Sequence, residues 1–517
     1  MTADNPADDE DRRPTILITT DHHYVVDQAL SALVAFGGVY VRARTLVHLV
    51  RDRDKGSATT YPDGEFVIAP VHRDHLLELL GRAARWVRGE RDAPVPGWVA
   101  SMLLARGEWP ELPALDGVTG SPVLRADGTI HASRAYDRVT RIYFDPGKTS
   151  YPRIKAKATR RDAVRAIDDL LSPFCDFPFV AESDRSAVAA LILSIIGRGA
   201  IDGCVPMYGI GAPTPGTGKG LLVDVAALIA TGRVSPKMAP APDDEMRKRL
   251  LTYAIAGDPI VTIDNVSVPL GGASLAMALT AGVVTDRVLG RSEKRTVPLR
   301  AVFTATGNNL QYKGDLGRRV VPIDLDPRCE HPEDRQTWRH SDLVSYVRRQ
   351  RPRLVVAALT LLRAYTLAGR PAHGKPPKGS FEAWDRLVRG CILWVGAADP
   401  LGGVSRIRAQ ADDDVDRLRA LHAAWYGQFG GRAVTVAEAV DKAGSAGPLY
   451  DALVAYCRDK PNSLHVGFAL RKLRDRVVGG RRLERESINR NGIARWRVRG
   501  MRGMVSTIGA ARRSHTK

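Results

Sequence analysis

A lysine framed by glycines stands between an apolar segment that ends near residue 211 and a helical pattern over residues 221–230. Glycines allow backbone N–H groups to turn inward around an anion, and the dipole of a helix N-terminus favours negative charge there. Lys219 has the position from which one ammonium group reaches the β- and γ-phosphates of a nucleotide. We therefore predict that ATP is bound by Pro215, Gly216, Thr217, Gly218, Lys219, Gly220 and Leu221.

Two positions of this loop depart from the common phosphate-binding pattern. Pro213 replaces the first glycine, and Gly220 replaces the serine or threonine whose hydroxyl normally holds Mg²⁺. A glycine-rich turn between a strand and a helix also occurs in folds that bind no nucleotide. The segments that follow must therefore decide between the two interpretations.

An acidic residue follows the next apolar segment. Asp264 and Asn265 come directly after residues 260–263, which read as a buried strand. An acid at this strand end can hold Mg²⁺, directly or through water, beside a bound triphosphate. We predict that Asp264 binds the metal and that Asp264 and Asn265 belong to the catalytic centre. Most such ATPases have a glutamate as general base where this chain has Asn265, so the base stays unassigned, with Glu245 as a candidate.

Two further polar pairs complete an ordered series of motifs. A strand over residues 301–306 precedes Asn308 and Asn309, where a polar side chain can orient the attacking water; the alternative is an ordinary Asn-rich turn. Arg318 and Arg319 precede a strand over residues 320–325, and either can act as an arginine finger on a neighbour's γ-phosphate. The alternative for the arginines is a solvated pair. Because all four motifs occur in order, we include both pairs in the catalytic centre.

Alternating strands and helices must position these residues. From about 160 to 335, apolar strands bounded by Gly and Asp alternate with helical segments, which is typical of a doubly wound α/β sheet. Turns and short strands before residue 158 indicate a mixed α/β module. We expect a disordered acidic tail at 1–14, an accessory domain at 15–158, a P-loop ATPase domain at 159–335, a helical connector at 336–407, a winged helix at 408–500 and a disordered basic tail at 501–517.

Composition limits the class of protein. Of 517 residues, 44% are hydrophobic and 26% charged, as in soluble globular proteins. No apolar stretch approaches the roughly 20 residues that a membrane span needs, and the acidic N-terminus is unlike a signal peptide. The five cysteines form no Cys-x-x-Cys pair, which favours reduced thiols in a cytoplasm over a zinc site or disulfides.

Positive charge is concentrated at the C-terminus. The net charge is +19, and residues 471–517 hold 15 Lys/Arg against 3 Asp/Glu. A basic segment of this kind suggests a polyanionic partner. We predict nucleic-acid contact, mainly through phosphates and therefore sensitive to salt, by Arg471, Lys472, Arg474, Arg476, Arg481 and Arg482.

The pattern around these residues predicts a winged helix. A core-facing stripe at helical spacing, followed by Gly479-Gly480 as the helix end, leads to a hairpin with an Asn-Gly turn at 491–492. Three helices and a basic hairpin usually place the third helix in the major groove of duplex DNA. The alternatives are a protein-binding winged helix or a solvated basic face. The stripe consists of Val466, Ala469, Leu470, Leu473 and Val477.

With these motifs together, residues 205–335 resemble the helicase domain of superfamily 3 and poxvirus-type primase-helicases, which belong to the AAA+ class. The chain as a whole is similar to helicase-like proteins of bacterial prophages and integrative elements. The resemblance implies a homo-hexameric ring with ATP sites between subunits and single-stranded DNA in the central channel. It also implies that residues 287–300 form a hairpin projecting into the channel, with Arg291, Lys294 and Arg295 gripping the DNA backbone. An exposed charged turn is the alternative.

The expected function is that of an ATP-dependent DNA helicase, with ATP and Mg²⁺ as cofactors, acting in replication of a phage-like or integrative element. A separate primase is a possible partner. One competing hypothesis is an AAA+ loader or remodelling ATPase that binds DNA without unwinding it. Another is a DNA-binding protein whose degenerate loop no longer hydrolyses ATP, which Gly220 and Asn265 keep open.

Overall fold

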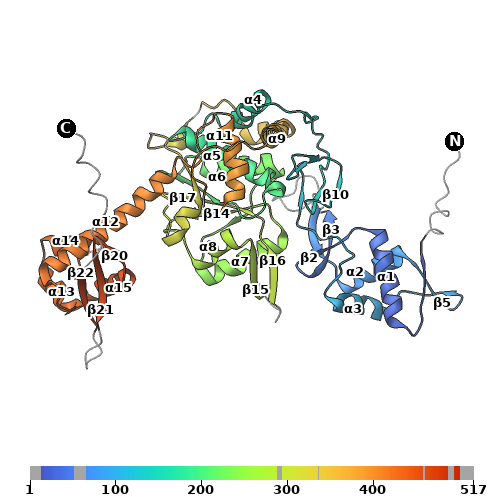
Figure 1. The fold of residues 1–517 in the computed structure, drawn as a ribbon, viewed down its shortest axis with the longest axis horizontal. Helices are drawn as coiled ribbons and strands as arrows, with labels where there is room; N and C mark the ends of the chain where they lie inside the picture. Colours follow the sequence, from blue (N-terminus) through green and yellow to red (C-terminus); the bar gives the residue numbers. More distant parts are fainter. Residues whose placement is uncertain are drawn as a thin grey trace, which may run out of the picture. The chain divides into compact units, whose positions relative to one another are not determined.

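The computed structural model describes residues 13–51, 66–287, 294–335, 337–457, 460–486 and 494–500 (Figure 1). The chain divides into two compact units, Met1–Val404 and Ser405–Lys517. Residues 1–12 of the predicted tail at 1–14, the predicted tail at 501–517, the Asn-Gly turn at 491–492 and Arg291 lie outside the described residues. In the described part of the chain, no helix has the length and apolarity to cross a membrane.

The N-terminal module of the first unit mixes short strands with three helices. Asp21 accepts a hydrogen bond from Tyr24 N and starts the helix α1, whose buried residues recur every three or four positions. Its small sheets have the strand orders β1-β5-β6, β2-β3-β4, β10-β11-β7 and β8-β9. The elements are β1 Thr15–Leu17, α1 His22–Phe36, β2 Val39–Arg42, β3 Thr45–Arg51, β4 Phe66–Pro70, α2 Arg73–Ala83, β5 Arg85–Arg88, β6 Arg91–Asp92, α3 Gly97–Arg106, β7 Gly117–Thr119, β8 Val123–Leu124, β9 Ile130–His131, β10 Ala135–Asp137 and β11 Ile142–Phe144.

A five-stranded parallel sheet forms the centre of the first unit, with the order β13-β14-β17-β12-β18. Its strands are β12 Met207–Ala212, β13 Lys237–Met238, β14 Ile260–Val266, β17 Val302–Asn308 and β18 Val320–Asp324. The predicted parallel α/β sheet is thereby confirmed, and β17 lies between the strand before the glycine loop and the strand of Asp264. The long apolar runs follow from burial on both faces, which parallel sheets require.

Helices surround this sheet on the same unit. They are α4 Arg160–Leu171, α5 Glu182–Ile196, α6 Lys219–Thr231, α7 Asp243–Ala256, α8 Ala273–Ala281, α9 Leu343–Leu367, α10 Glu382–Trp384 and α11 Gly390–Trp394. Figure 1 shows α4 beside α9, and the two helices pack on each other. The carboxyl ends of β12, β14 and β17 lie at one edge, because parallel strands end on the same side.

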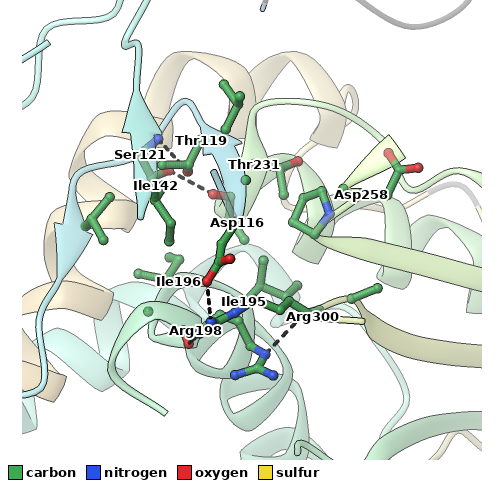
Figure 2. Close-up of a pocket in the computed structure, with 18 of the residues that line it drawn as sticks. Asp116, Thr119, Ser121, Ile142, Ile195, Ile196, Arg198, Thr231, Asp258 and Arg300 are labelled. Carbon is green, nitrogen blue, oxygen red and sulfur yellow. Dashed lines mark hydrogen bonds and ion pairs between the residues drawn. The ribbon is translucent and has the colours of Figure 1, made fainter. Parts of the chain in front are cut away.

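The N-terminal module meets the central sheet and its helices around three arginines, of which Arg42 is buried. Arg42 of β2 is 6% exposed and donates to Asp116 O at 2.6 Å and to Ala254 O, near the C-terminus of α7, at 2.6 Å. Arg300 pairs with Asp116 at 2.8 Å, and Arg198 donates to Arg300 O at 3.1 Å. Figure 2 shows Asp116, Arg198 and Arg300 together beside a cavity of about 70 Å³. A cation at a helix C-terminus is favourable, so these contacts anchor the module on α7 and on the segment before β17.

The C-terminal unit has a four-stranded antiparallel sheet, in the order β19-β22-β21-β20, and a core of its own. Its elements are α12 Val404–Phe429, β19 Val434–Thr435, α13 Val436–Ala443, α14 Pro448–Val454, α15 Ser463–Leu473, β20 Val477–Val478, β21 Arg481–Glu486 and β22 Arg495–Gly500. For residues 408–500 the sequence suggested three helices and then a hairpin, whereas the structure has most of α12 there, followed by β19, three short helices and the strands β20, β21 and β22. The long helix α12 crosses the predicted domain start at 408.

One detail of the predicted third helix is wrong. α15 ends at Leu473, and Val477 is 53% exposed in β20 rather than part of the core-facing stripe. Arg474 is extended and Asp475 has φ of +63°, which ends the helix, and Asp475 N donates to Leu483 O of β21. Gly479-Gly480 turns β20 into β21 instead of ending the helix.

Candidate nucleotide-binding site

The glycine loop has the backbone of an anion-binding turn. Gly216 and Gly218 have φ of +71° and +91°, a region that residues with a Cβ rarely adopt. The helix α6 begins directly after Gly218, and no side chain caps its first turn. Thr217 Oγ1 donates to Thr214 O at 2.9 Å, which closes the loop on itself. The N–H groups of a helix N-terminus without a side-chain cap are suited to phosphate.

Lys219 lies across this loop. Its Nζ donates to Thr214 O at 2.9 Å, and burial lowers the pKa of its ammonium group. A carbonyl oxygen is a neutral acceptor that a phosphate oxygen can replace with a stronger, charge-assisted bond. Lys219 is therefore placed to bind the terminal phosphates.

A cleft of about 400 Å³ brings the predicted motifs together. It lies where β12, β14 and β17 end, so the segments that supply its lining are distant in sequence and adjacent in the sheet. The size is that of small-molecule sites. Its lining residues are Pro215, Gly216, Thr217, Gly218, Lys219, Gly220, Asp264, Asn265, Thr306, Gly307 and Asn308.

The strand that carries Asp264 is irregular at that residue. The register of β14 on β17 shifts between Ile263 and Val266, and Asn265 has φ of +56°. Thr306 Oγ1 of β17 donates to Asp264 Oδ1 at 2.5 Å and accepts from Asn265 N at 3.1 Å. The hydroxyl of Thr306 therefore fixes both the carboxylate and the backbone behind it. Sequence reasoning missed Thr306, because threonine is common in strands and gives no separate signal.

The lining of the cleft fits a magnesium nucleotide. Mg²⁺ in nucleotide sites binds one or two carboxylates and the substrate phosphates, and Asp264 is the one carboxylate among the described lining residues. Gly220 offers no hydroxyl, although a Cβ there would meet no atom within 4 Å. No group of three or more His, Cys, Asp or Glu side chains forms a metal site among the described residues. Asp264 is accordingly the residue that would hold the ion.

Besides Leu221 and the two arginines, two predicted residues, Glu245 and Asn309, lie outside the lining of this cleft. Glu245 is paired with Lys248 at 3.5 Å and with Arg249 at 3.3 Å on α7. Asn309 is exposed, and its backbone N donates to Ala212 O at 3.0 Å. Asn308 lines the cleft and Asn309 shapes the turn after it, while the general base stays unassigned.

The side chains of Arg318 and Arg319 differ in exposure and in the number of contacts that hold them. Both lie in the 3₁₀ helix η5 Gly314–Arg319 and pair with Asp315. The side chain of Arg319 is only 14% exposed and also donates to Ala276 O and to Thr280 Oγ1, the latter at 2.8 Å. The side chain of Arg318 is 68% exposed. Arg318 is thus the arginine that can reach another molecule, and neither lines the cleft of its own chain.

A second cavity of about 500 Å³ shares Gly216, Thr217 and Gly218 with the cleft. Its other walls come from the predicted Leu221, from residues 176–178, and from parts of 327–335 and 338–344, including Phe177, which faces Gly218, and Trp338, which is 46% exposed. Glu333 lies against Gly216. Two aromatic rings and a carboxylate beside a phosphate loop can accept a base and the hydroxyls of a sugar. No sequence pattern indicated this cavity, because its walls come from segments that are far apart along the chain.

The described basic residues predicted to contact nucleic acid lie in two regions of the chain, the hairpin at 283–298 and the C-terminal unit. The strands β15 Val283–Arg287 and β16 Lys294–Pro298 form an antiparallel hairpin, as the resemblance implied. Lys294 is exposed; in the backbone register of the hairpin it stands opposite Arg287, and Arg295 stands opposite Asp286.

In the C-terminal unit, the basic residues fall into two groups. Arg471 and Lys472 are exposed at the end of α15, and Arg476 is exposed beyond it. Arg474 is also exposed and pairs with Asp475 at 2.9 Å, whereas Arg482 is half-buried and donates to Glu484 at 2.9 Å. Two guanidinium groups cover aromatic rings, Arg471 over Phe468 at 4.5 Å and Arg481 over Tyr426 at 5.1 Å. The exposed group is therefore smaller than the sequence suggested.

No family model matches the chain, and no curated protein does. Among solved structures, the chain is similar to the NrS-1 C-terminal region in its apo form, at 12% identity and a TM-score of 0.35, covering 88% of this chain and 96% of that chain. It is similar to SCCmec type IV Cch, described as an active helicase, at 11% identity and a TM-score of 0.29, covering 74% of this chain and 79% of that chain. It is similar to JCV helicase at 14% identity and a TM-score of 0.19, covering 48% of this chain and 74% of that chain.

The chain is similar to superfamily 3 helicases in its ordered motifs, and the solved structures that it matches include two described as helicases.

Proposed function

We propose that this chain is an ATP-dependent DNA helicase of the superfamily 3 type, acting in replication of a phage-like or integrative mobile element. One observation carries the ATPase part of the proposal. Lys219, Asp264 and Asn308, from the ends of three adjacent parallel strands and their loops, line one cleft with a glycine turn. Phosphoryl transfer needs this arrangement, because its catalysis is mostly positioning and neutralisation of charge. The link to a mobile element rests on the resemblance of the motifs.

In this proposal each residue of the cleft has a separate role. The N–H groups of the loop and the Lys219 ammonium hold the β- and γ-phosphates. Asp264, fixed by Thr306, would hold Mg²⁺, which supplies neutralisation of the phosphate charge. Asn308 orients the attacking water. The adenosine part of ATP occupies the cavity between Phe177 and Trp338.

The exposed Arg318 supports an assembly in which the site is completed by a neighbour. Its own cleft contains no described arginine, while an arginine finger in trans stabilises the charge of the transition state. We propose a homo-hexamer on this ground and on the resemblance. The β15–β16 hairpin would hold single-stranded DNA in the channel, and α15 would contact duplex DNA.

A strand-displacement assay tests the helicase proposal. A forked DNA duplex with one labelled strand should be unwound by the wild-type chain with ATP and Mg²⁺, and not with a non-hydrolysable ATP analogue. Lys219→Ala serves as the control for contaminating helicases. ATP turnover that is stimulated by DNA without strand release would instead establish the loader or remodelling ATPase.

A second candidate function, that of a DNA-binding protein without ATP hydrolysis, is favoured by Gly220 and Asn265. Gly220 provides no hydroxyl for the metal, and Asn265 stands where the general base is usually a glutamate. In that case the chain binds ATP and DNA without hydrolysis. The same preparation distinguishes the two. Binding of a fluorescent ATP analogue that is lost in Lys219→Ala, with no phosphate release above that variant, would establish the non-hydrolysing protein.

A further inference from the structure

A buried lysine from the helical region after the sheet contacts the backbone at Arg318. Lys378 is 8% exposed, and its Nζ donates to Arg318 O at 2.9 Å and to Val320 O at 3.1 Å. The cleft residues do not include Lys378, and no sequence pattern assigned it a role. The Lys378 ammonium group therefore binds the backbone where η5 is joined to β18.

The two carbonyl groups need an outside donor. The last carbonyls of a helical turn have no partner within the helix, and a cation is favourable at that end. β18 is the edge strand of the sheet; on its outer side Asp324 O accepts from Val180 N at the far end of the strand, while Val320 O at the near end accepts from Lys378. Lys378 satisfies an acceptor on each side of the junction, and thereby fixes the backbone from which the Arg318 side chain extends.

A buried charged network holds Lys378 in turn. Lys378 N donates to Asp385 Oδ1 at 3.3 Å, and Arg389 donates to the same carboxylate at 2.8 Å and to Asp399 at 2.8 Å. His373 lies 2.9 Å from Asp385. Asp385 and Arg389 are 3% and 4% exposed, and they bound a π-helical segment, Asp385–Arg389. A π-helical turn is rare and is often found at functional sites.

We propose that Lys378 is a positioning residue for the arginine finger, holding the backbone of Arg318 so that its side chain enters the nucleotide cleft of the neighbouring subunit. The inference rests on the proposed function. It explains the contrast between the two arginines: Arg319 is fixed through its own guanidinium, whereas Arg318 has a side chain that is 68% exposed and a backbone fixed by Lys378. An arginine finger needs a side chain that can reach the neighbouring subunit and a backbone that is held in place.

The test compares Lys378→Met with Lys375→Met in the full-length chain. Lys375 is a lysine of the same segment, 48% exposed, that pairs with Asp399 of the same network and not with the backbone at Arg318, so it controls for the loss of one charge from the network. Because a misplacement of about 1 Å can cost a hundredfold in rate, Lys378→Met should lower kcat for ATP by about ten- to a hundredfold. KM for ATP should stay within about twofold, since the neighbour's finger acts on the transition state. Lys375→Met should keep the wild-type kcat, and Lys378→Arg should recover most of it.

A mixing experiment separates positioning from damage to the fold. Lys378→Met has an intact cleft, so it should regain turnover when co-assembled with an excess of Lys219→Ala, which supplies a correctly held Arg318. Lys378→Met should cost nothing further in an Arg318→Ala background, because residues that act as a unit are not additive. If Lys378→Met does not fold by circular dichroism, Lys378→Gln, which keeps an N–H donor without the charge, takes its place.

The possible results distinguish a failure of the proposed function from a failure of this inference. An inactive wild-type chain overturns the proposed function and this inference with it. An active wild type in which Lys378→Met equals Lys375→Met overturns the inference alone. No rescue in mixtures shown to co-assemble, a chain that stays monomeric while active, or a further loss in the Arg318→Ala background also overturns it.

Discussion

Gly220→Ser should strengthen the response of the enzyme to Mg²⁺. Gly220 is the second residue of α6, directly after Lys219, and a Cβ there would meet no atom within 4 Å. Serine also has a better helix propensity than glycine by about 0.5 kcal/mol, so the fold should tolerate the change. The new hydroxyl would stand where most phosphate loops hold the metal, and here the ion has Asp264 as its one described carboxylate.

The magnitude follows from one added contact. A hydrogen bond to a charged group is worth about 1.5 kcal/mol, and we take a hydroxyl bound to the metal as equivalent. Because about 1.4 kcal/mol is a factor of ten, the Mg²⁺ concentration for half-maximal ATP turnover should fall about tenfold. The assay is phosphate release at saturating ATP over a series of Mg²⁺ concentrations.

Gly220→Ala is the matched control, since it adds the same Cβ and favours the helix at least as much as serine does, but has no hydroxyl. It should leave the Mg²⁺ dependence unchanged and stabilise α6 slightly. Equal Mg²⁺ curves for Gly220→Ser and Gly220→Ala would contradict this prediction, because position 220 would then not face the metal.

Thr306→Val keeps the volume of the side chain and removes the donor to Asp264, so kcat should fall by about tenfold with little change in thermal unfolding. An unchanged kcat would show that the carboxylate is held by other means. Deleting residues 408–517, which cuts α12 in its first turn, should leave basal ATPase activity but weaken DNA binding. The slope of log affinity against log salt should flatten by about 0.9 for each duplex phosphate that the deleted residues neutralise. Replacing Arg471, Lys472 and Arg474 with Ala should flatten it partway; equal slopes would indicate a merely solvated basic surface.

The strands and the residues at their ends were accessible from the sequence. Apolar runs that end in Asp264 or Asn308 predict buried strands with a polar edge, and the alternation with helices predicts a parallel sheet. The structure has that sheet, with the predicted loop and strand ends around one cleft. Periodicity and strand-end polarity are local signals, so one sequence suffices to read them.

Features that depend on tertiary contacts could not be predicted from the sequence. Thr306 reads as an ordinary strand residue until β17 is placed beside β14. Val477 continues a helical period, but Asp475 takes a left-handed conformation that pairs it with β21, so the period ends early. Lys378 and Arg318 are 60 residues apart, and only packing on the edge strand joins them.

Whether this cleft hydrolyses ATP is decided by the rate of phosphate release from the wild-type chain and from Lys219→Ala, each with and without single-stranded DNA. Lys219 binds a backbone carbonyl that phosphate can replace, so its removal should take away the γ-phosphate contact without disturbing the sheet. We predict turnover by the wild type, stimulation by DNA, and no turnover above background in a Lys219→Ala variant with an unchanged circular dichroism spectrum. Wild-type turnover in Lys219→Ala, or none in either chain, would show that this cleft is not an ATPase site.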